Sequence, residues 1–85
     1  MPRYERSWLE IAQEQYDSLP ATTRRLVDRR VEELLDDPTG NPDATYYRRF
    51  DEWIIPFGAD EGFISYAVVE EPRRLVILRR VIFLG

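Results

Sequence analysis

The spacing of apolar residues changes once, near the middle of the chain, and this change restricts the fold more than any other feature. Before residue 38 the apolar side chains recur at the period of an amphipathic helix. After residue 43 they form short runs rich in branched and aromatic residues, separated by turn residues, which is typical of strands. The segment between, Pro38–Asp43, is a loop by composition. The sequence therefore predicts helices followed by strands, an α+β layer.

Two helices are expected in the first half. Residues 7–10, Ser-Trp-Leu-Glu, have the form of a capping box, in which Ser7 and Glu10 bond free amides at a helix start. A second helix is expected over residues 22–35, capped by Thr22 or Thr23. The short connection through Pro20 predicts an antiparallel helical hairpin.

Three or four strands are expected in the second half, over residues 46–50, 53–57, 63–69 and 75–84. Pro56 lacks an amide, which favours an edge or a bulge for its strand. Residues 4–7 could add a short strand or an arm. The sequence thus predicts an N-terminal antiparallel helical hairpin packed on one face of a three- to four-stranded antiparallel sheet. The other face would be open and concave.

The length and the missing residue types restrict the chemistry. A chain of 85 residues allows one domain, residues 1–85, with one core. It has no cysteine and no histidine, so disulfides, thiolate chemistry and the commonest metal ligand are excluded. The acidic pairs Asp36-Asp37, Asp60-Glu61 and Glu70-Glu71 lie at turns or helix ends, with no spacing that supports a metal or two-carboxylate site. We therefore expect no metal and no cofactor.

The charge is acidic overall, yet a local basic face remains possible. Formal net charge is −4, but all 12 cations are arginine and most of them stand in adjacent pairs. The N-terminus is charged and lacks an apolar stretch, and no apolar run approaches the length of a membrane span. We expect a soluble, cytoplasmic protein without a membrane partner.

Arg79 and Arg80 interrupt the apolar last strand and are the first candidate site. Successive strand residues take opposite faces, so one arginine is expected toward the helices and the other toward the open face. The inward one would need an acidic partner or a route to solvent. The outward one could contact a phosphate or an acidic partner. The alternative is that both form structural salt bridges.

A second candidate lies just after the loop, where Arg48 and Arg49 follow Tyr46 and Tyr47. Arginines interleaved with aromatic residues can bind nucleic acid through phosphate contacts and base stacking. The same composition also suits a half-exposed edge strand. Arg30 is different, because it falls inside the apolar arc of the second helix. It is expected to snorkel or to pair with a carboxylate.

The apolar end of the last strand, including Val81 and Phe83, is expected to be adhesive unless it is covered. Partner binding is the preferred explanation, and a homodimer is the second. Trp53, Phe57, Phe63 and Tyr66 could form a ligand-facing aromatic cluster that binds a small molecule. The alternative is that they pack in the core or across strands.

Several segments together resemble the RelE/ParE superfamily of type II toxin–antitoxin toxins. They are Leu19-Pro20 with the later Leu34–Pro38, the run Trp53–Phe57 followed by Gly62–Tyr66, and the closing strand Arg74–Leu78. The resemblance covers almost the whole chain and implies a RelE-like fold. It also implies a cognate antitoxin as partner. The target would be the ribosome and its messenger RNA, which ribonuclease members cleave, or a topoisomerase.

Position by position, the resemblance implies site residues but leaves gaps. Tyr66 keeps its place in the family pattern, and Arg79 and Arg80 are the arginines available for catalysis. Basic residues of the pattern fall on Ile54 and Pro56. A further arginine falls on Ile64, another falls near the end of the last strand on Phe83 or Leu84, and no tyrosine or histidine follows that strand. A non-toxic interaction module that keeps the fold without the catalytic residues is therefore the alternative function.

Overall fold

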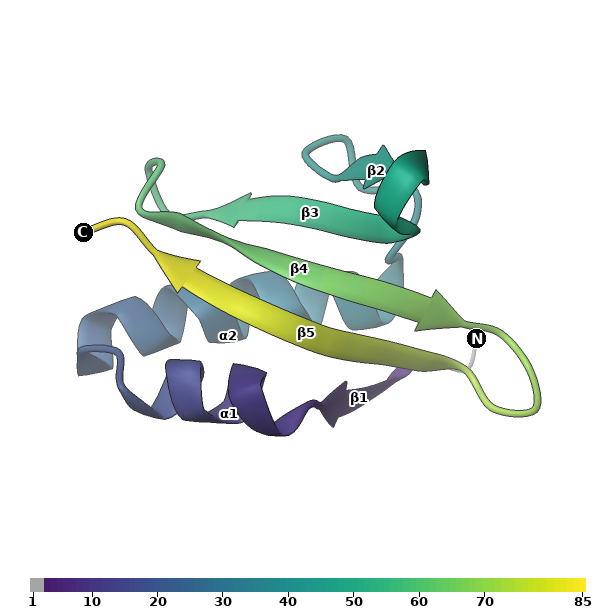
Figure 1. Cartoon of the computed structure of the whole chain (residues 1–85), viewed down its shortest axis with the longest axis horizontal. Helices are drawn as coiled ribbons and strands as arrows, with labels where there is room; N and C mark the ends of the chain where they lie inside the picture. Colours follow the sequence, from purple (N-terminus) through teal and green to yellow (C-terminus); the bar gives the residue numbers. More distant parts are fainter. Residues whose placement is uncertain (1–2) are drawn as a thin grey trace.

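The computed structural model describes residues 3–85, in which two helices lie behind a twisted sheet (Figure 1). The order follows the expected change from helices to strands, with one strand added at the front. The elements are β1 (Glu5–Trp8), α1 (Glu10–Asp17), α2 (Ala21–Asp36), β2 (Thr45–Tyr47), the 3-10 helix η1 (Arg48–Phe50), β3 (Glu52–Phe57), β4 (Gly62–Val69) and β5 (Leu75–Phe83).

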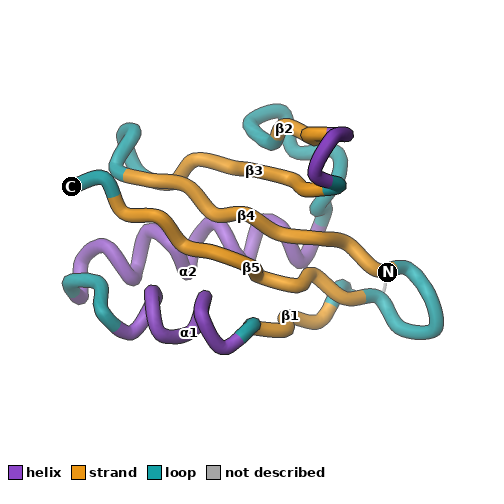
Figure 2. The backbone as a smooth tube through the Cα atoms, in the orientation of Figure 1, coloured by secondary structure: helices purple, strands orange, loops and turns teal. Residues whose placement is uncertain are grey.

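The sheet has five strands in the order β1-β5-β4-β3-β2. Strands β2 to β5 form an antiparallel meander, as expected. The prediction of a wholly antiparallel sheet of three or four strands is wrong, because β1 pairs in parallel with β5. The helical hairpin between β1 and the meander supplies the long crossover that a parallel pair requires. Figure 2 shows β1 beside the start of β5, with both helices on one side.

The core lies between the helices and the sheet. Alternate residues of β3, β4 and β5 point toward the helices and are buried, which follows from the two-residue period of a strand. Residues of α1 and α2 at helical spacing meet them. The buried apolar set is Ala12, Leu19, Val27, Val31, Leu34, Leu35, Ile55, Phe57, Ile64, Tyr66, Val76, Leu78 and Val81.

Neither helix uses the cap that the sequence predicts. Ser7 belongs to β1 and pairs with Ile77, so the capping box does not form. Leu9 precedes α1 and Pro20 precedes α2, and neither helix has a side-chain cap hydrogen bond. The amide of Leu9 instead donates to Leu78 O at 3.0 Å, because β1 continues its pairing with β5 up to the start of the helix.

The chain after the loop forms less strand than expected. Strand β2 ends at Tyr47, and residues 48–50 coil into η1. Since β2 pairs only with the first half of β3, Pro56 lies on a locally open edge, as its missing amide predicts. The side chain of Arg30 reaches this edge and donates to the carbonyl of Pro56 at 2.8 Å.

A β-bulge interrupts the pairing of β4 with β5. Ser65 pairs with Arg80 and Tyr66 with Leu78, which leaves Arg79 as an extra residue. The core positions on either side of the bulge remain on the helix side, whereas Arg79 and Arg80 both reach the open face. The prediction that one of the two arginines points toward the helices is therefore wrong. The extra residue resets the alternation of the strand.

Tyr66 anchors the loop to the sheet from the core side. Its side chain is fully buried, stacks on Trp53 with ring centroids 6.2 Å apart, and donates from its hydroxyl to Pro38 O at 2.7 Å. Burial, and to a lesser extent the charge of Asp37, raises the pKa of Tyr66 above the ordinary value of a phenol. Tyr66 therefore packs in the core, which was the alternative to a ligand-facing position.

We expect Tyr66→Phe to lower the free energy of unfolding by about 1–3 kcal/mol at neutral pH, because the buried carbonyl of Pro38 loses its donor. The raised pKa keeps Tyr66 protonated in the folded protein, whereas in the unfolded chain it ionises near about pH 10. The stability that Tyr66 provides is complete below that pH and declines above it. Urea titrations from pH 7 to 11 should therefore show the two proteins converging, and a constant difference would contradict this account.

Deletion of Arg79 should remove the bulge and leave the inward side chains on both sides in place. We expect a single cooperative unfolding transition close to that of the parent. Deletion of Ile77 is the control, because it makes Val76 and Leu78 neighbours that cannot both face the helices. Turning one of them outward costs roughly 1.5–3 kcal/mol. Thermal unfolding followed by circular dichroism measures both, and equal losses would show that Arg79 is not an insertion.

Candidate functional site

A groove runs across the open face of the sheet, opposite the helices. Its volume is about 570 Å³, and it joins a second hollow of about 370 Å³ through the shared residues Ile54 and Phe63. Apolar walls from three strands enclose a short row of charged and polar groups. The open-face groove is lined by Phe50, Glu52, Ile54, Phe63, Ser65, Arg79, Arg80 and Ile82.

The charges in the groove are two guanidinium groups and one carboxylate. Arg79 Nη1 lies 4.0 Å from Glu52 Oε1, at the outer limit of an ion pair, and the Glu52 side chain is 19% exposed. The side chain of Arg80 is exposed and has no ion pair or hydrogen bond within residues 3–85. Because the bulge places two cations beside one anion, the groove has a local positive excess on a protein of net charge −4.

Ser65 adds an unsatisfied polar group to the floor of the groove. The residue is 3% exposed, and its hydroxyl has no hydrogen-bond partner in the described part of the chain. Buried hydroxyl groups are normally hydrogen-bonded. Ser65 pairs in register with Arg80, so the free hydroxyl and the free guanidinium come from neighbouring backbone positions.

The second predicted cluster, Tyr47 to Arg49, spans the end of β2 and the start of η1. Tyr47 lines the adjoining hollow and is 45% exposed. Arg48 and Arg49 belong to η1 rather than to a strand, and Arg49 lies over the ring of Phe50 at 5.9 Å. The hydrogen bond of the Tyr46 hydroxyl to Asp51 raises the pKa of Tyr46. The structure therefore brings Tyr47 to the open face that also carries the Arg79-Arg80 pair, and it places Arg49 beside Phe50.

Tyr66, the third expected catalytic residue, lies away from that face. It points to the helix side and is fully buried, so it cannot contact a ligand in the open-face groove. Tyr66 follows Ser65 in β4, so only its backbone lies next to the groove.

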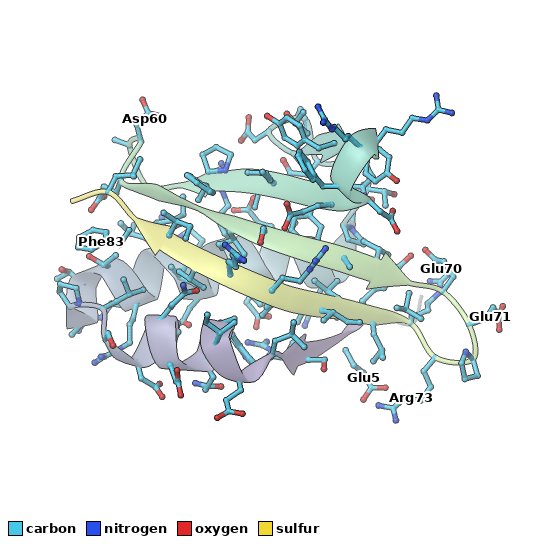
Figure 3. All side chains as sticks on the ribbon, in the orientation of Figure 1. Glu5, Asp60, Glu70, Glu71, Arg73 and Phe83 are labelled. Carbon is cyan, nitrogen blue, oxygen red and sulfur yellow. The ribbon has the colours of Figure 1, made fainter. Side chains whose placement is uncertain are left out.

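The apolar end of β5 is largely covered by the chain itself. Val81 is 3% exposed, and its amide donates to Gln15 Oε1 of α1 at 2.7 Å. Strand β1 pairs with the first half of β5, so that half is not an edge. Phe83 is 40% exposed and lies at the end of β5 (Figure 3). Of the two residues predicted for partner contact, Phe83 is accessible and Val81 is not.

Arg30 of α2 forms an ion pair with Asp43 in the loop that precedes β2. Arg30 Nη1 contacts Glu33 at 2.8 Å and Nη2 contacts Asp43 at 2.7 Å, which confirms the expected pairing with carboxylates. Burial by itself lowers the pKa of Arg30, but the hydrogen bonds to Asp43 and Glu33 outweigh it and raise the pKa above its usual value. Asp43 also lines the second hollow, so Arg30 helps to shape that wall.

The acidic pairs do not assemble into a site. Asp60 lies at one end of the sheet, and Glu70 and Glu71 lie at the other (Figure 3). Within residues 3–85, no group of three or more acidic residues is placed to hold a metal ion. No helix in this range is long and apolar enough to cross a membrane.

Sequence reasoning missed three residues of the groove, namely Phe50, Glu52 and Ser65. Phe50 was assigned to a strand, although the following Asp51 has a positive φ of 49° that ends the strand-like course. Glu52 sits one position before the expected start of its strand, and Ser65 is a single polar residue in an apolar run. The two-residue period could have placed Glu52 and Ile54 on one face, but it could not show that this face is the open one.

The chemistry available to the open-face groove is anion binding and, through one carboxylate, proton transfer. Arg79 and Arg80 can donate to phosphate or carboxylate oxygens. Glu52 can accept a proton when it is ionised. The chain has no lysine or histidine that could share this work.

Comparisons with known proteins were made on sequence and on structure. No protein-family model and no curated protein matches the sequence. A chain of the E. coli RelBE toxin–antitoxin complex superposes with a TM-score of 0.80 at 19% identity, covering 96% of this chain and 98% of that one. A chain of the Mycobacterium tuberculosis RelBE2 complex gives 0.80 at 17%, covering 95% and 98%.

A third solved structure, an E. coli RelE variant in complex with an antitoxin RelB peptide, gives a TM-score of 0.79 at 20% identity. The match covers 100% of this chain and 86% of that one. Since the three alignments span nearly the whole of the described residues, the agreement concerns the complete arrangement of helices and sheet. The chain therefore has the fold of the RelE toxins.

Proposed function

We propose that this protein is the toxin component of a type II toxin–antitoxin pair, which binds a cognate antitoxin and inhibits translation in the cytoplasm by binding RNA in the open-face groove. The RelE-like fold supports the class of protein. The observation that carries the mode of action is the bulge in β5, which places Arg79 and Arg80 together in a groove on the uncovered face.

Two adjacent guanidinium groups on one face favour an anionic ligand. Two like charges that line one groove repel one another, and a phosphate bound between them would relieve this repulsion while accepting hydrogen bonds from both. Glu52 offsets one of the two charges, and the Arg80 side chain has no ion-pair partner among the residues described. A phosphodiester backbone crossing β5 supplies the matching charge.

Cleavage of the bound RNA would depend on Glu52 as the proton acceptor. It is the carboxylate that lines the groove, and it lies beside Arg79 at 4.0 Å. The ribose 2′-hydroxyl would attack phosphorus as the base takes its proton, the bond from phosphorus to the 5′-oxygen would break, and the departing oxygen would take a proton from water. A guanidinium can stabilise the charge that develops on the phosphate. Inhibition by binding alone requires no base, and topoisomerase inhibition or a non-toxic interaction module would need none either.

The antitoxin would contact the exposed apolar residues at the end of β5. Phe83, the last residue of β5, is 40% exposed, and Leu84, which follows it, is 68% exposed; neither lines the open-face groove. A partner that covers large exposed apolar side chains gains about 1.5–3 kcal/mol for each one that it buries. A second copy of the chain is the alternative occupant of this end.

Induced expression of the chain alone should arrest growth and reduce incorporation of labelled amino acids. The double variant Arg79→Ala/Arg80→Ala should restore growth, because the groove loses both phosphate contacts. The matched control is Arg25→Ala/Arg29→Ala, which removes two exposed arginines from α2 on the opposite side of the molecule and should leave the arrest unchanged. Normal growth with the parent chain would exclude toxicity, and a DNA-damage response with intact translation would indicate a topoisomerase target.

Glu52→Gln should separate RNA binding from cleavage. Removing the negative charge beside Arg79 should tighten RNA binding several-fold, by about 1 kcal/mol or less for a partly exposed pair. If Glu52 is the base, the rate of cleavage should fall by about 10²- to 10⁴-fold. Electrophoresis of RNA incubated with purified protein and ribosomes measures the cleavage. An unchanged rate in Glu52→Gln would remove Glu52 from the chemistry while leaving inhibition by binding in place.

A further inference from the structure

The turn between β2 and β3 holds one aromatic ring out toward the groove. Phe50 ends η1 and is 64% exposed, the highest value for an aromatic residue in the described part of the chain. Asp51 follows in the left-handed region with φ 49°, and its amide donates to Arg48 O at 3.2 Å. Tyr46 donates from its hydroxyl to the Asp51 carboxylate at 2.7 Å. Hydrogen bonds on both sides of Asp51 therefore fix the turn.

This exposure needs a reason, because a phenylalanine side chain gains stability when it is buried. The turn also uses a positive φ at a residue other than glycine, a conformation that is uncommon in proteins. Locally strained backbone of this kind tends to occur where a side chain is held for a ligand. Phe50 is moreover one of the two phenylalanines that line the open-face groove, together with Phe63, and the same groove is lined by Arg79 and Arg80 of β5.

We propose that Phe50 stacks on an unpaired nucleobase of the RNA whose neighbouring phosphate is bound by Arg79 and Arg80. This inference rests on the proposed function of the groove. Every base has a flat π surface, so an exposed aromatic ring can stack on it whatever the sequence. Arg49 lies over the Phe50 ring at 5.9 Å and adds a positive charge next to the stacked base.

The polar groups of the groove suit the rest of a nucleotide. Ser65 has a buried hydroxyl without a partner, and it pairs in register with Arg80. The Ser65 hydroxyl is covered by its neighbours, so the groups that a phosphate can reach directly are the two guanidinium groups. A single groove thus offers a stacking surface and two cations that can bind a phosphate.

A single strand fits this arrangement better than a duplex. The bases of a duplex are stacked on their neighbours and would have to be unstacked before one could reach Phe50. An unpaired base meets the ring without that cost. We therefore expect a preference for single-stranded over paired RNA, with little preference among base sequences.

The test uses the purified chain and fluorescein-labelled hexaadenylate RNA, with affinity measured by fluorescence anisotropy at several salt concentrations. Phe50→Ala should weaken binding by about 5- to 150-fold, the loss expected for one stacked base. Phe50→Trp should restore it. The slope of affinity against salt should stay the same in both, because the phosphate contacts remain. A labelled RNA hairpin of equal length should bind more weakly and respond less to Phe50→Ala.

Ile11→Ala is the control, since Ile11 is also an exposed large apolar residue, at 51%, but lies on α1, outside the groove. It should bind hexaadenylate as the parent does. Equal affinities for the parent and Phe50→Ala would overturn the stacking role. Loss of affinity for a co-expressed antitoxin instead of RNA would also overturn it, and would assign Phe50 to a protein interface.

Failure of the stacking role is distinguishable from failure of the proposed function. If Arg79→Ala/Arg80→Ala weakens hexaadenylate binding and lowers the salt slope while Phe50→Ala has no effect, the groove binds RNA and only the stacking role is wrong. If the parent chain binds neither RNA, the RNA-binding function fails and the stacking role fails with it.

Discussion

The pairing of β5 on both of its sides is the constraint on which the rest of the structure depends. Strand β4 pairs with it along almost its whole length, and β1 pairs with its first half. These contacts join residues from the two ends of the chain and close the sheet over the helical hairpin. Gln15 of α1 caps the amide of Val81 where β1 no longer reaches. The apolar last strand is thereby a central element rather than an adhesive edge.

The bulge in β5 couples this pairing to the character of the open face. A regular strand would direct one of two adjacent arginines into the core, where an unpaired guanidinium is costly. The extra residue keeps Leu78 and Val81 buried and gives both arginines to the groove. The same bulge therefore keeps the core apolar and places both cations on the open face. The positive excess of the groove is local, on a protein that is acidic overall.

The fold of the RelE toxins is present without the basic residues that the family resemblance would place on its central strands. Ile54 and Pro56 make that part of the open face apolar. The polar content of the groove comes instead from Glu52, Ser65 and the two arginines of β5. A groove of this composition is suited to bind a phosphate beside a flat apolar group.

The sequence by itself determined the class of the fold. The change from helical to strand period, the loop at Pro38–Asp43 and the proline at position 56 predicted the hairpin, the meander and the locally open edge. It could not determine that Ser7 belongs to a strand, because the partner of that strand lies about seventy residues later, at Ile77. Local capping preferences are weak compared with a backbone ladder that only long-range pairing creates.

The candidate site, too, was predicted in part from the sequence and decided in part by the tertiary structure. Arg79, Arg80, Tyr47, Arg48 and Arg49 stood out in the sequence as arginines and aromatics in an unusual setting, and the structure places Arg79, Arg80 and Tyr47 on the open face. The direction in which Arg79 and Arg80 point was decided only in the tertiary structure. A bulge depends on the register of two strands, and a single strand read alone carries no information about its partner's register. Phe50 and Glu52 joined the site for the same reason, since their neighbours come from other strands.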